Sequence, residues 1–243
     1  MASKPQRLFV EQRLETLGEI ELDQAQAHYL ITVLRCKAGE GVLLFNGEDG
    51  EWRGSLAALA KKKARVKLIE QTRPQAKGPD LHYLFAPLKR ARLDYMAQKA
   101  TEMGASMLRP VITRRTIAER VNLERLRANA IEAAEQCGIL RIPEIRKPES
   151  LDDLLAAWDP ARLLVFADEG AEVTSPLAAL AGDKPGQLAV LIGPEGGFED
   201  EERSLLRKQP FVRIISLGPR LLRADTAAVA ALTLVNAVLG DWK

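Results

Sequence analysis

Two glycine-bearing stretches near the carboxyl end of the chain carry the residue types from which a ligand pocket is built. The apolar run 188–192 passes directly into Gly-Pro-Glu-Gly-Gly at 193–197. A second apolar run, 211–215, leads through Ser-Leu into Gly-Pro-Arg at 218–220. Short runs rich in β-branched residues that end in glycine are typical of buried strands of a parallel sheet, and glycine lets backbone groups face a ligand without a Cβ between them. Because ligands of open α/β sheets bind beyond the carboxyl ends of the strands, the two stretches together predict one pocket.

The charges of the first loop indicate which class of ligand this pocket takes. Glu195 lies inside the loop, and four more carboxylates follow at 199–202. The loop has no Lys, Ser or Thr in the places that a phosphate-binding P-loop requires. Since these carboxylates repel a polyphosphate, the sequence favours a neutral or cationic ligand held largely by backbone groups. On physics alone, two tight turns with no ligand remain an open alternative.

The elements that position these loops fall into two parts. Residues 1–72 show many short strands and one helix, which Asp23 caps, and this pattern is typical of a small β-barrel. Residues 73–80 are rich in proline, glycine and polar side chains and predict a linker. From 81 to 243 strands alternate with helices, which indicates a parallel sheet. We therefore expect an α/β fold with an N-terminal β-barrel.

The final helix has the composition of a buried element. It is expected to open near Asp225 or Thr226, either of which can cap it, and its run 227–235 is apolar on almost every side. A helix of this kind is buried in a core or in a subunit interface. Among the strands, we expect 107–112 to be interrupted by Pro110.

Composition narrows the class of protein. A chain of 243 residues with 47% hydrophobic residues suits two domains, and no apolar run approaches the ~20 residues that span a bilayer. Residues 1–12 show no export segment, and Cys36 and Cys137 are isolated, so we expect a reducing, cytoplasmic location. Only two histidines are present, and no metal-ligand spacing occurs, so we expect no metal site.

Charge is distributed unevenly along the chain. Residues 89–147 carry 13 basic and 7 acidic side chains, whereas residues 148–243 carry 9 basic and 15 acidic ones. The plain interpretation is a set of solvated helix faces. The alternative is a basic surface that meets a nucleic-acid backbone while the pocket end stays acidic.

Four motifs resemble those of one known family. LIGPEGGF at 191–198 and LGPRLLRADTAAVAAL at 217–232 are similar to the two cofactor loops of the bacterial 16S ribosomal RNA uracil-N3 methyltransferases, which belong to the SPOUT class. Residues 28–52 resemble the N-terminal RNA-binding domain of that family, and QKATEMG at 98–104 with EAAEQC at 132–137 resembles its central helices. The resemblance covers the whole chain, and the four motifs stand in the family's order and spacing.

One departure from the family pattern is visible in the second loop. The family usually reads Leu-Arg-Thr-Glu-Thr-Ala, whereas this chain has Ala224 and Asp225 in place of the Thr-Glu pair. The carboxylate is kept but is one methylene shorter, and a hydroxyl is lost.

The resemblance implies a fold, a cofactor and an assembly. It implies a PUA-like RNA-binding domain at 1–72, a SPOUT domain with a C-terminal trefoil knot at 81–243, and a homodimer. It implies S-adenosylmethionine as the methyl donor. The residues expected to bind this cofactor are Asp168, Ile192, Gly193, Pro194, Glu195, Gly196, Gly197, Leu217, Gly218, Leu221 and Leu222. For Gly196 and Gly197, turn geometry alone remains the alternative.

The chemistry that the resemblance implies is difficult because uracil N3 holds a proton near neutral pH. The enzyme must stabilise a developing anion and give the proton a route away. Arg223 matches the family's Leu-Arg pair and is expected to favour the uracil anion; pairing with Asp225 or with a helix end is its alternative role. Asp225 and Glu195 are the candidate bases, and water is a further one.

The expected RNA contacts are basic side chains, with ordinary surface solubility as the alternative for each. They are Arg7, Lys61, Lys62, Arg114, Arg115 and Arg220.

Three functions compete at this point. The first is S-adenosylmethionine-dependent methylation of N3 of a uridine in the 16S ribosomal RNA of the small subunit. The second is a non-catalytic RNA-binding assembly factor, against which the retention of both loops speaks. The third is a SPOUT methyltransferase acting on another RNA base or on ribose.

Overall fold

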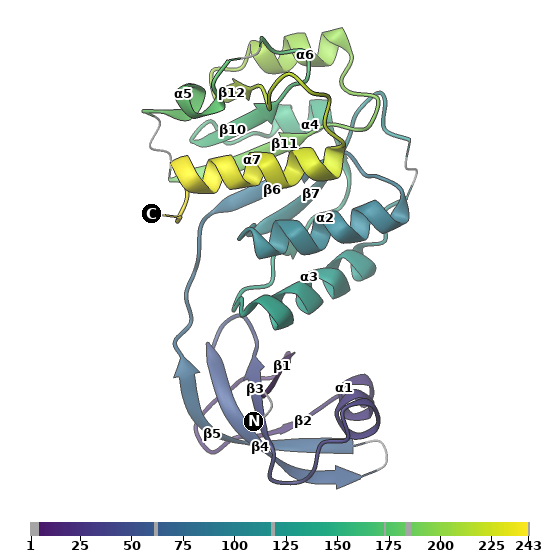
Figure 1. Ribbon diagram of the computed structural model, residues 1–243, viewed down its shortest axis with the longest axis vertical. Coiled ribbons are helices and arrows are strands. Elements are labelled where there is room, and N and C mark those ends of the chain that lie inside the picture. Colours follow the sequence, from purple (N-terminus) through teal and green to yellow (C-terminus); the bar gives the residue numbers. More distant parts are fainter. Residues whose placement is uncertain (1–4, 61–62, 118–119, 173, 183–185, 243) are drawn as a thin grey trace. The chain divides into compact units, whose positions relative to one another are not determined.

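The computed structural model describes residues 5–60, 63–117, 120–172, 174–182 and 186–242 (Figure 1). The chain divides into two compact units. Unit 1 comprises Met1–Lys77 together with Ala134–Arg141, and unit 2 comprises Gly78–Ala133 and Ile142–Lys243. That residues 134–141 group with unit 1 is an assignment that no sequence pattern indicated.

Unit 1 is built on a five-stranded sheet. Its strands are β1 (Gln6–Phe9), β2 (Glu19–Glu21), β3 (Gly41–Phe45), β4 (Glu51–Ala60) and β5 (Lys63–Arg73), in the order β1-β3-β4-β5-β2. Only β1 and β3 run parallel; the other pairs are antiparallel. In β5 the apolar side chains of Ala64, Val66 and Leu68 are buried and the charged ones between them are exposed, as the alternation predicts.

Helix α1 (Gln24–His28) of unit 1 continues as a π-helical turn over Tyr29–Val33. Asp23 caps it as expected. The Asp23 side chain accepts from the Gln26 N–H, and the Gln26 side chain accepts from the Asp23 N–H, so two backbone donors are satisfied.

Unit 2 is an α/β unit with a parallel sheet, which confirms the predicted fold class. The strands are β6 (Leu81–Phe85), β7 (Met107–Ile112), β8 (Glu144–Ile145), β9 (Glu149–Ser150), β10 (Arg162–Ala167), β11 (Gln187–Ile192) and β12 (Val212–Ile215). Their order is β12-β10-β11-β6-β7-β8, with β9 also paired to β7. Every pair is parallel, so the carboxyl ends of β6, β10, β11 and β12 lie at one edge.

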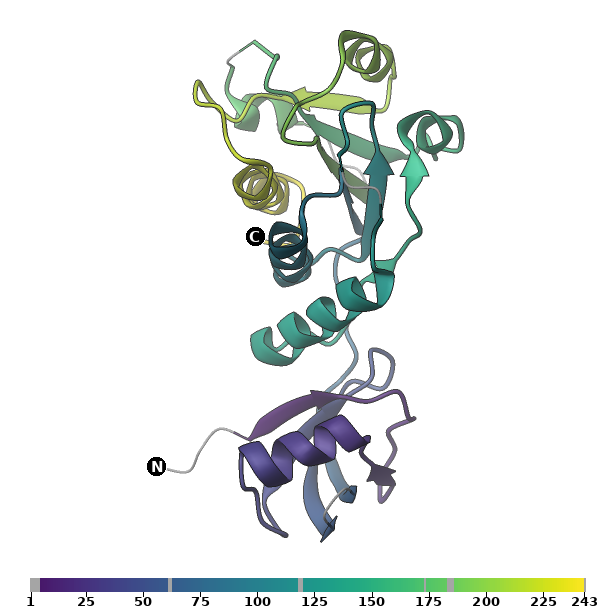
Figure 2. The same ribbon diagram turned by 90° about the vertical axis from the view of Figure 1, so that its right-hand side faces the viewer.

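Helices cover both faces of this sheet (Figure 2). They are α2 (Arg90–Glu102), α3 (Leu123–Cys137), α4 (Leu151–Ala156), α5 (Pro176–Leu180), α6 (Asp200–Arg207) and α7 (Ala224–Val238). Helices α2 and α7 pack on one face, and α4 and α6 on the other. Along β11, Val190 belongs to the core on the α2 and α7 side, whereas Ala189 and Leu191 belong to the opposite core. This burial on both faces explains why the strand reads as an unbroken apolar run.

Two local predictions are wrong. Pro110 does not interrupt β7, because it pairs in register with Phe85 and the sheet neighbours on the other side divide around it: β8 pairs with Met107 and Leu108, and β9 with Val111 and Ile112. A proline, which has no N–H, is therefore tolerated there.

The expected caps of the final helix are also wrong. Helix α7 begins at Ala224 with Arg223 as its N-cap residue, and neither Asp225 nor Thr226 caps it. The trefoil knot that the resemblance implies stays a prediction.

Candidate active site

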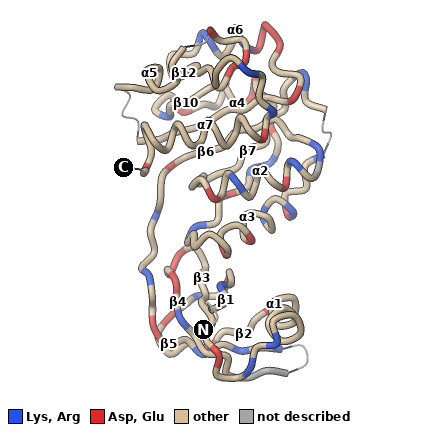
Figure 3. The backbone as a smooth tube through the Cα atoms, in the orientation of Figure 1, with Lys and Arg blue, Asp and Glu red and all other residues tan. Residues whose placement is uncertain are grey.

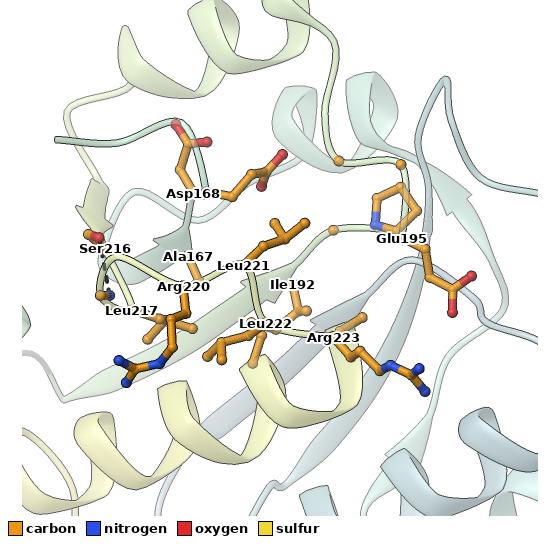
Figure 4. Close-up of a pocket in the computed structure, with 18 of the residues that line it drawn as sticks. Ala167, Asp168, Ile192, Glu195, Ser216, Leu217, Arg220, Leu221, Leu222 and Arg223 are labelled. Carbon is orange, nitrogen blue, oxygen red and sulfur yellow. Dashed lines mark hydrogen bonds between the residues drawn. The ribbon is translucent and has the colours of Figure 1, made fainter. Parts of the chain in front are cut away.

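The segments that follow β10, β11 and β12 line a cavity of about 810 Å³ at the carboxyl edge of the sheet in unit 2 (Figure 4). This volume lies within the range of roughly 300–1,000 Å³ that is usual for small-molecule sites. The two glycine loops predicted to form one pocket therefore do so. The lining residues are Arg92, Ala167, Asp168, Glu169, Ile192, Gly193, Pro194, Glu195, Gly196, Gly197, Ser216, Leu217, Gly218, Pro219, Arg220, Leu221, Leu222, Arg223, Ala224 and Ala227.

The loop after β11 requires glycine at one of its two adjacent glycine positions. Gly197 has a φ of 70°, and a Cβ there would lie 2.1 Å from a carboxylate oxygen of Glu169. Its N–H donates to the carbonyl of Pro194 at 2.9 Å and closes the turn. At Gly196 an added Cβ would meet only the Arg115 side chain, at 3.5 Å, which is ordinary contact. The geometry of the turn therefore depends on Gly197 and not on Gly196.

Side chains from outside the loop hold it in place. Arg115 donates to the carbonyl oxygen of Gly196 at 2.9 Å, and Arg92 of α2 forms an ion pair with Glu195. Beyond the loop, Glu202 accepts from the N–H of Arg114 and from the N–H of Glu199, each at 2.9 Å. The acidic start of α6 is visible in Figure 3.

The carboxylates of the cavity already have cationic partners. Asp168 is 2% exposed and accepts from Arg203 at 3.1 Å and from Arg207 at 2.8 Å. Glu169 pairs with Arg203 as well. Burial lowers the pKa of Arg203, but the neighbouring Glu169 and Asp168 carboxylates outweigh burial and raise the pKa above its ordinary value. Because Glu195 also has Arg92, the acidic groups that line the cavity are balanced before any ligand binds.

The loop after β12 supplies the apolar side of the cavity. The N–H of Gly218 donates to the Ser216 hydroxyl at 3.3 Å, and Gly218 has a φ of 97° with open space where a Cβ would stand. A ligand can therefore approach this backbone closely. Leu221 extends over the cavity and is 85% exposed, and Leu222 lies below it (Figure 4). An apolar side chain this exposed at a cavity rim is one that a bound ligand would cover.

The predicted catalytic residues lie at different depths in this arrangement. Arg223 lines the cavity and is exposed, and within the described ranges no carboxylate lies within ion-pair distance of it, so the alternative pairing with Asp225 is not observed. Glu195 also lines the cavity. Asp225 lies in the first turn of α7, outside the set of lining residues, and its carboxylate accepts from the Thr226 N–H at 2.9 Å. Burial raises the pKa of the nearby Tyr83 hydroxyl well above its ordinary value, and the Asp225 charge adds to this.

The structure corrects the expected RNA contact of Arg7. This side chain is 8% exposed, pairs with Glu51 at 2.5 Å, and donates to the carbonyls of Ala134 and Ile139. Burial lowers the pKa of Arg7, and the Glu51 carboxylate opposes that shift. An arginine so enclosed links parts of unit 1 to one another and exposes too little of its guanidinium to be an RNA contact.

The other predicted RNA contacts are placed as follows. Arg114 is exposed but pairs with Glu199 and Glu201, Arg115 holds the glycine loop, and Arg220 is exposed at the cavity rim. Lys61 and Lys62 lie outside the described residues.

Sequence reasoning missed Arg92, Arg203 and Arg207. For the last two a signal was available, because a spacing of four on the predicted helix places both on the face that meets the end of β10.

Neither a metal site nor a membrane-spanning helix occurs in the described part of the chain. No group of three or more histidine, cysteine or carboxylate side chains among these residues could hold a metal ion. None of the described helices has the length and apolar character needed to cross a bilayer.

Comparisons with known proteins match parts of both units to families of RNA methyltransferase domains. Residues 75–236 match the family model of the RNA methyltransferase domain, and residues 22–69 match that of the RNA methyltransferase PUA domain. A Ribosomal RNA small subunit methyltransferase E of Rickettsia conorii is 33% identical over 235 residues, which cover 96% of each chain. The protein of that name from Bacillus subtilis is 27% identical and covers 95% of this chain and 96% of its own.

Solved structures agree with these matches. A methyltransferase of Legionella pneumophila, solved with bound S-adenosylmethionine, is 29% identical with a TM-score of 0.86, covering 98% of this chain and 99% of its own. A Ribosomal RNA small subunit methyltransferase E of Neisseria gonorrhoeae, bound to S-adenosylmethionine, has the same fold at a TM-score of 0.87 and 23% identity, over 99% of this chain and 100% of its own.

Proposed function

This chain belongs to the Ribosomal RNA small subunit methyltransferase E family, and from that premise we propose that it methylates N3 of a specific uridine in 16S ribosomal RNA. It is an RNA methyltransferase that uses S-adenosylmethionine. The observation that carries the proposal is the single cavity that both glycine loops line.

The residues of the cavity fit this cofactor. Open space beside the Gly218 backbone leaves room for close contact between this backbone and a ligand. Leu217, Leu221 and Leu222 offer apolar surface to an adenine ring. Of the arginines that line the cavity, Arg92 is paired with Glu195, whereas Arg220 and Arg223 have no carboxylate within ion-pair distance among the described residues. When bound, S-adenosylmethionine supplies a methyl group on a positively charged sulfur.

Arg223 is the residue we propose for stabilising charge on the base. Uracil N3 becomes nucleophilic as its proton leaves, and negative charge then spreads to O2 and O4. An arginine that faces the cavity with no carboxylate partner among the described residues can direct its guanidinium at such an oxygen. Its place at the N-cap of α7 fixes its backbone in an extended conformation at the rim.

The proton of N3 has three candidate destinations. Glu195 lines the cavity but is paired with Arg92. Asp225 lies between the lining residues Ala224 and Ala227 in the first turn of α7 but does not line the cavity itself. Water is the third. We propose that the cavity contributes mainly by aligning N3 with the methyl group.

We also propose the wider setting of the reaction. Residues 1–72 form the RNA-binding domain, 73–80 the linker and 81–243 the methyltransferase domain. The enzyme works in the cytoplasm as a homodimer. Tyr95 of α2 and Trp242 after α7 are large side chains exposed by 43% and 50%. Their exposure supports a dimer interface that involves α2 and the segment after α7. Light scattering of the purified protein tests the dimer.

Two measurements test the function. Calorimetry with S-adenosylmethionine separates an enzyme from a non-catalytic RNA-binding assembly factor, for which we expect no binding. Methylation of small subunits and of naked 16S RNA, followed by nucleoside mass spectrometry, identifies the product. We expect 3-methyluridine, and a base or ribose modified elsewhere would replace this proposal with another SPOUT activity.

A further inference from the structure

A second, smaller cavity lies directly beside the cofactor cavity in unit 2. Its volume is about 140 Å³, and its apolar lining comes from Pro87, Leu88, Ile117 and Pro194. Its charged lining consists of Lys89, Arg115 and Glu195. Pro194 and Glu195 line both cavities, so these two residues form the wall between them.

The size and the lining of the small cavity suit one planar ring. A protein cavity of about 150 Å³ lined by apolar side chains holds a single benzene molecule. Of the apolar lining residues, Leu88 is buried at 6% exposed, whereas Ile117 is 73% exposed. An isoleucine that exposed buries little apolar surface in its present position, and a ring placed in the cavity would cover more of it.

The charges around the small cavity suit a phosphodiester. Lys89 has no carboxylate within ion-pair distance among the described residues. Arg115 uses one nitrogen to hold the Gly196 carbonyl and lies 3.9 Å from Glu199, with its side chain half exposed. Glu195, the one carboxylate of the lining, is neutralised by Arg92. The rim is therefore positive, as a groove that tracks a nucleic-acid backbone must be.

We propose that this cavity receives the unstacked base of the nucleotide next to the methylated uridine, with the linking phosphate on Lys89 and Arg115. The proposal rests on the function proposed above. The target base itself must enter the cofactor cavity to reach the methyl group, and the Pro194–Glu195 wall stands between that place and the small cavity. A neighbouring base on the same strand is the group that fits beyond the wall. Apolar contact with a splayed base is a recognised mode of single-strand binding.

The cavity then also has a part in selecting the substrate. Because a base can enter the cavity only when it is unstacked, the cavity favours RNA in which the nucleotide beside the target is unpaired. Arg115 contacts both the linking phosphate and the glycine loop, so an RNA strand in place strengthens the wall of the cofactor cavity.

Steady-state kinetics on small subunits tests the cavity. Ile117→Asp places a carboxylate where the base packs, and the high exposure of Ile117 keeps the folded core intact. We expect the KM for the RNA substrate to rise about tenfold or more, with kcat and the Kd for S-adenosylmethionine within about twofold. The matched control is Leu177→Asp, which adds the same charge at another exposed apolar position, 53% exposed on α5, and is expected to leave KM unchanged.

Methyl NMR gives a readout that does not depend on turnover. With the protein saturated with S-adenosylhomocysteine, the dinucleotide uridylyl-uridine should shift the δ1-methyl resonance of Ile117, and the same probe lacking the base of the non-target residue should not. An equal shift from both probes, or none from either, would overturn the proposal, as would an unchanged KM for Ile117→Asp. If the wild-type protein transferred no methyl group at all, the proposed function would be wrong. The NMR experiment would still show whether the cavity binds the base.

Discussion

At the scale of single residues, the arginines of the site are of two kinds. Some are paired with carboxylates of the protein, and others remain available to contact a substrate. Arg92, Arg203 and Arg207 each pair with a carboxylate that lines the cavity. Arg220 and Arg223 line the same cavity and have no ion-pair partner within the described residues. Only the available arginines can respond to charge that develops on a substrate.

Arg223→Ala tests this distinction. We expect turnover to fall on the order of 10²-fold or more, because a group that stabilises developing charge is removed. The Kd for S-adenosylmethionine should change little, since the donor is itself a cation. Arg220→Ala, the control from the same loop, should reduce turnover far less. Near-normal turnover of Arg223→Ala would show that the assignment is wrong.

His82 predicts a specific dependence of stability on pH. Burial lowers the pKa of His82 to about 4, and the Arg162 charge adds to the shift. In the unfolded chain the pKa is about 6.5, so between pH 6.5 and 4 the unfolded state binds the proton more strongly and stability falls as the pH drops. Above pH 6.5 the effect is absent. We expect a loss of about 2 kcal/mol between pH 7 and pH 5.

Denaturant unfolding of two variants isolates this contribution. In His82→Gln the difference in unfolding free energy between pH 7 and pH 5 should shrink by that amount. His28→Gln changes the other histidine of the chain, which is exposed on α1, and should leave the difference as in the wild type. Identical pH dependence in the two variants would contradict the role of His82.

At the scale of elements, the strands and loops of the site follow from local sequence, but the contacts that lock them do not. The apolar runs before each glycine loop predict β11 and β12 because a parallel strand is buried on both faces. The burial of Arg7 depends on Glu51, 44 residues away, and on the carbonyls of Ala134 and Ile139, which are more distant still. Partners this distant along the chain cannot be predicted from the residues next to Arg7.

The start of α7 shows the same limit. Asp225 is a good capping residue by type. The conformation of the loop after β12 nevertheless makes Arg223 the N-cap residue, and the helix begins at Ala224. Tertiary constraints therefore outweigh the preference of a single residue.

The adjacent glycines of the first loop give a prediction at this scale. Gly197→Ala places a side chain at a φ of 70° and against Glu169, so we expect about 1–3 kcal/mol of lost stability. The displaced turn should also weaken S-adenosylmethionine binding at least tenfold. Gly196→Ala, next to it, meets only ordinary contacts and should change neither quantity much. Thermal unfolding and calorimetry on the pair make the comparison, and equal effects would mean that the turn is not what shapes the cavity.

At the scale of the whole molecule, the uneven charge of the chain has a measurable consequence. The stretch 89–147 has an excess of six basic side chains, and the stretch 148–243, which carries most of the cofactor cavity, has an excess of six acidic ones. An RNA strand is therefore attracted by one part of the chain and repelled by another, and it should bind through the first.

Binding through backbone phosphates predicts a strong dependence on salt. Each phosphate neutralised on a single strand contributes about −0.7 to the slope of log K against log salt concentration. With about four such contacts, 16S RNA should bind the full-length protein roughly 50-fold more weakly at 200 mM KCl than at 50 mM. Binding of S-adenosylmethionine, which displaces few counterions from the protein, should change less than about threefold over the same range, and it serves as the internal control. Filter binding and calorimetry on the same preparation measure both. A flat salt dependence for RNA would mean that base contacts and shape dominate recognition, and that the basic excess is only a solvated surface.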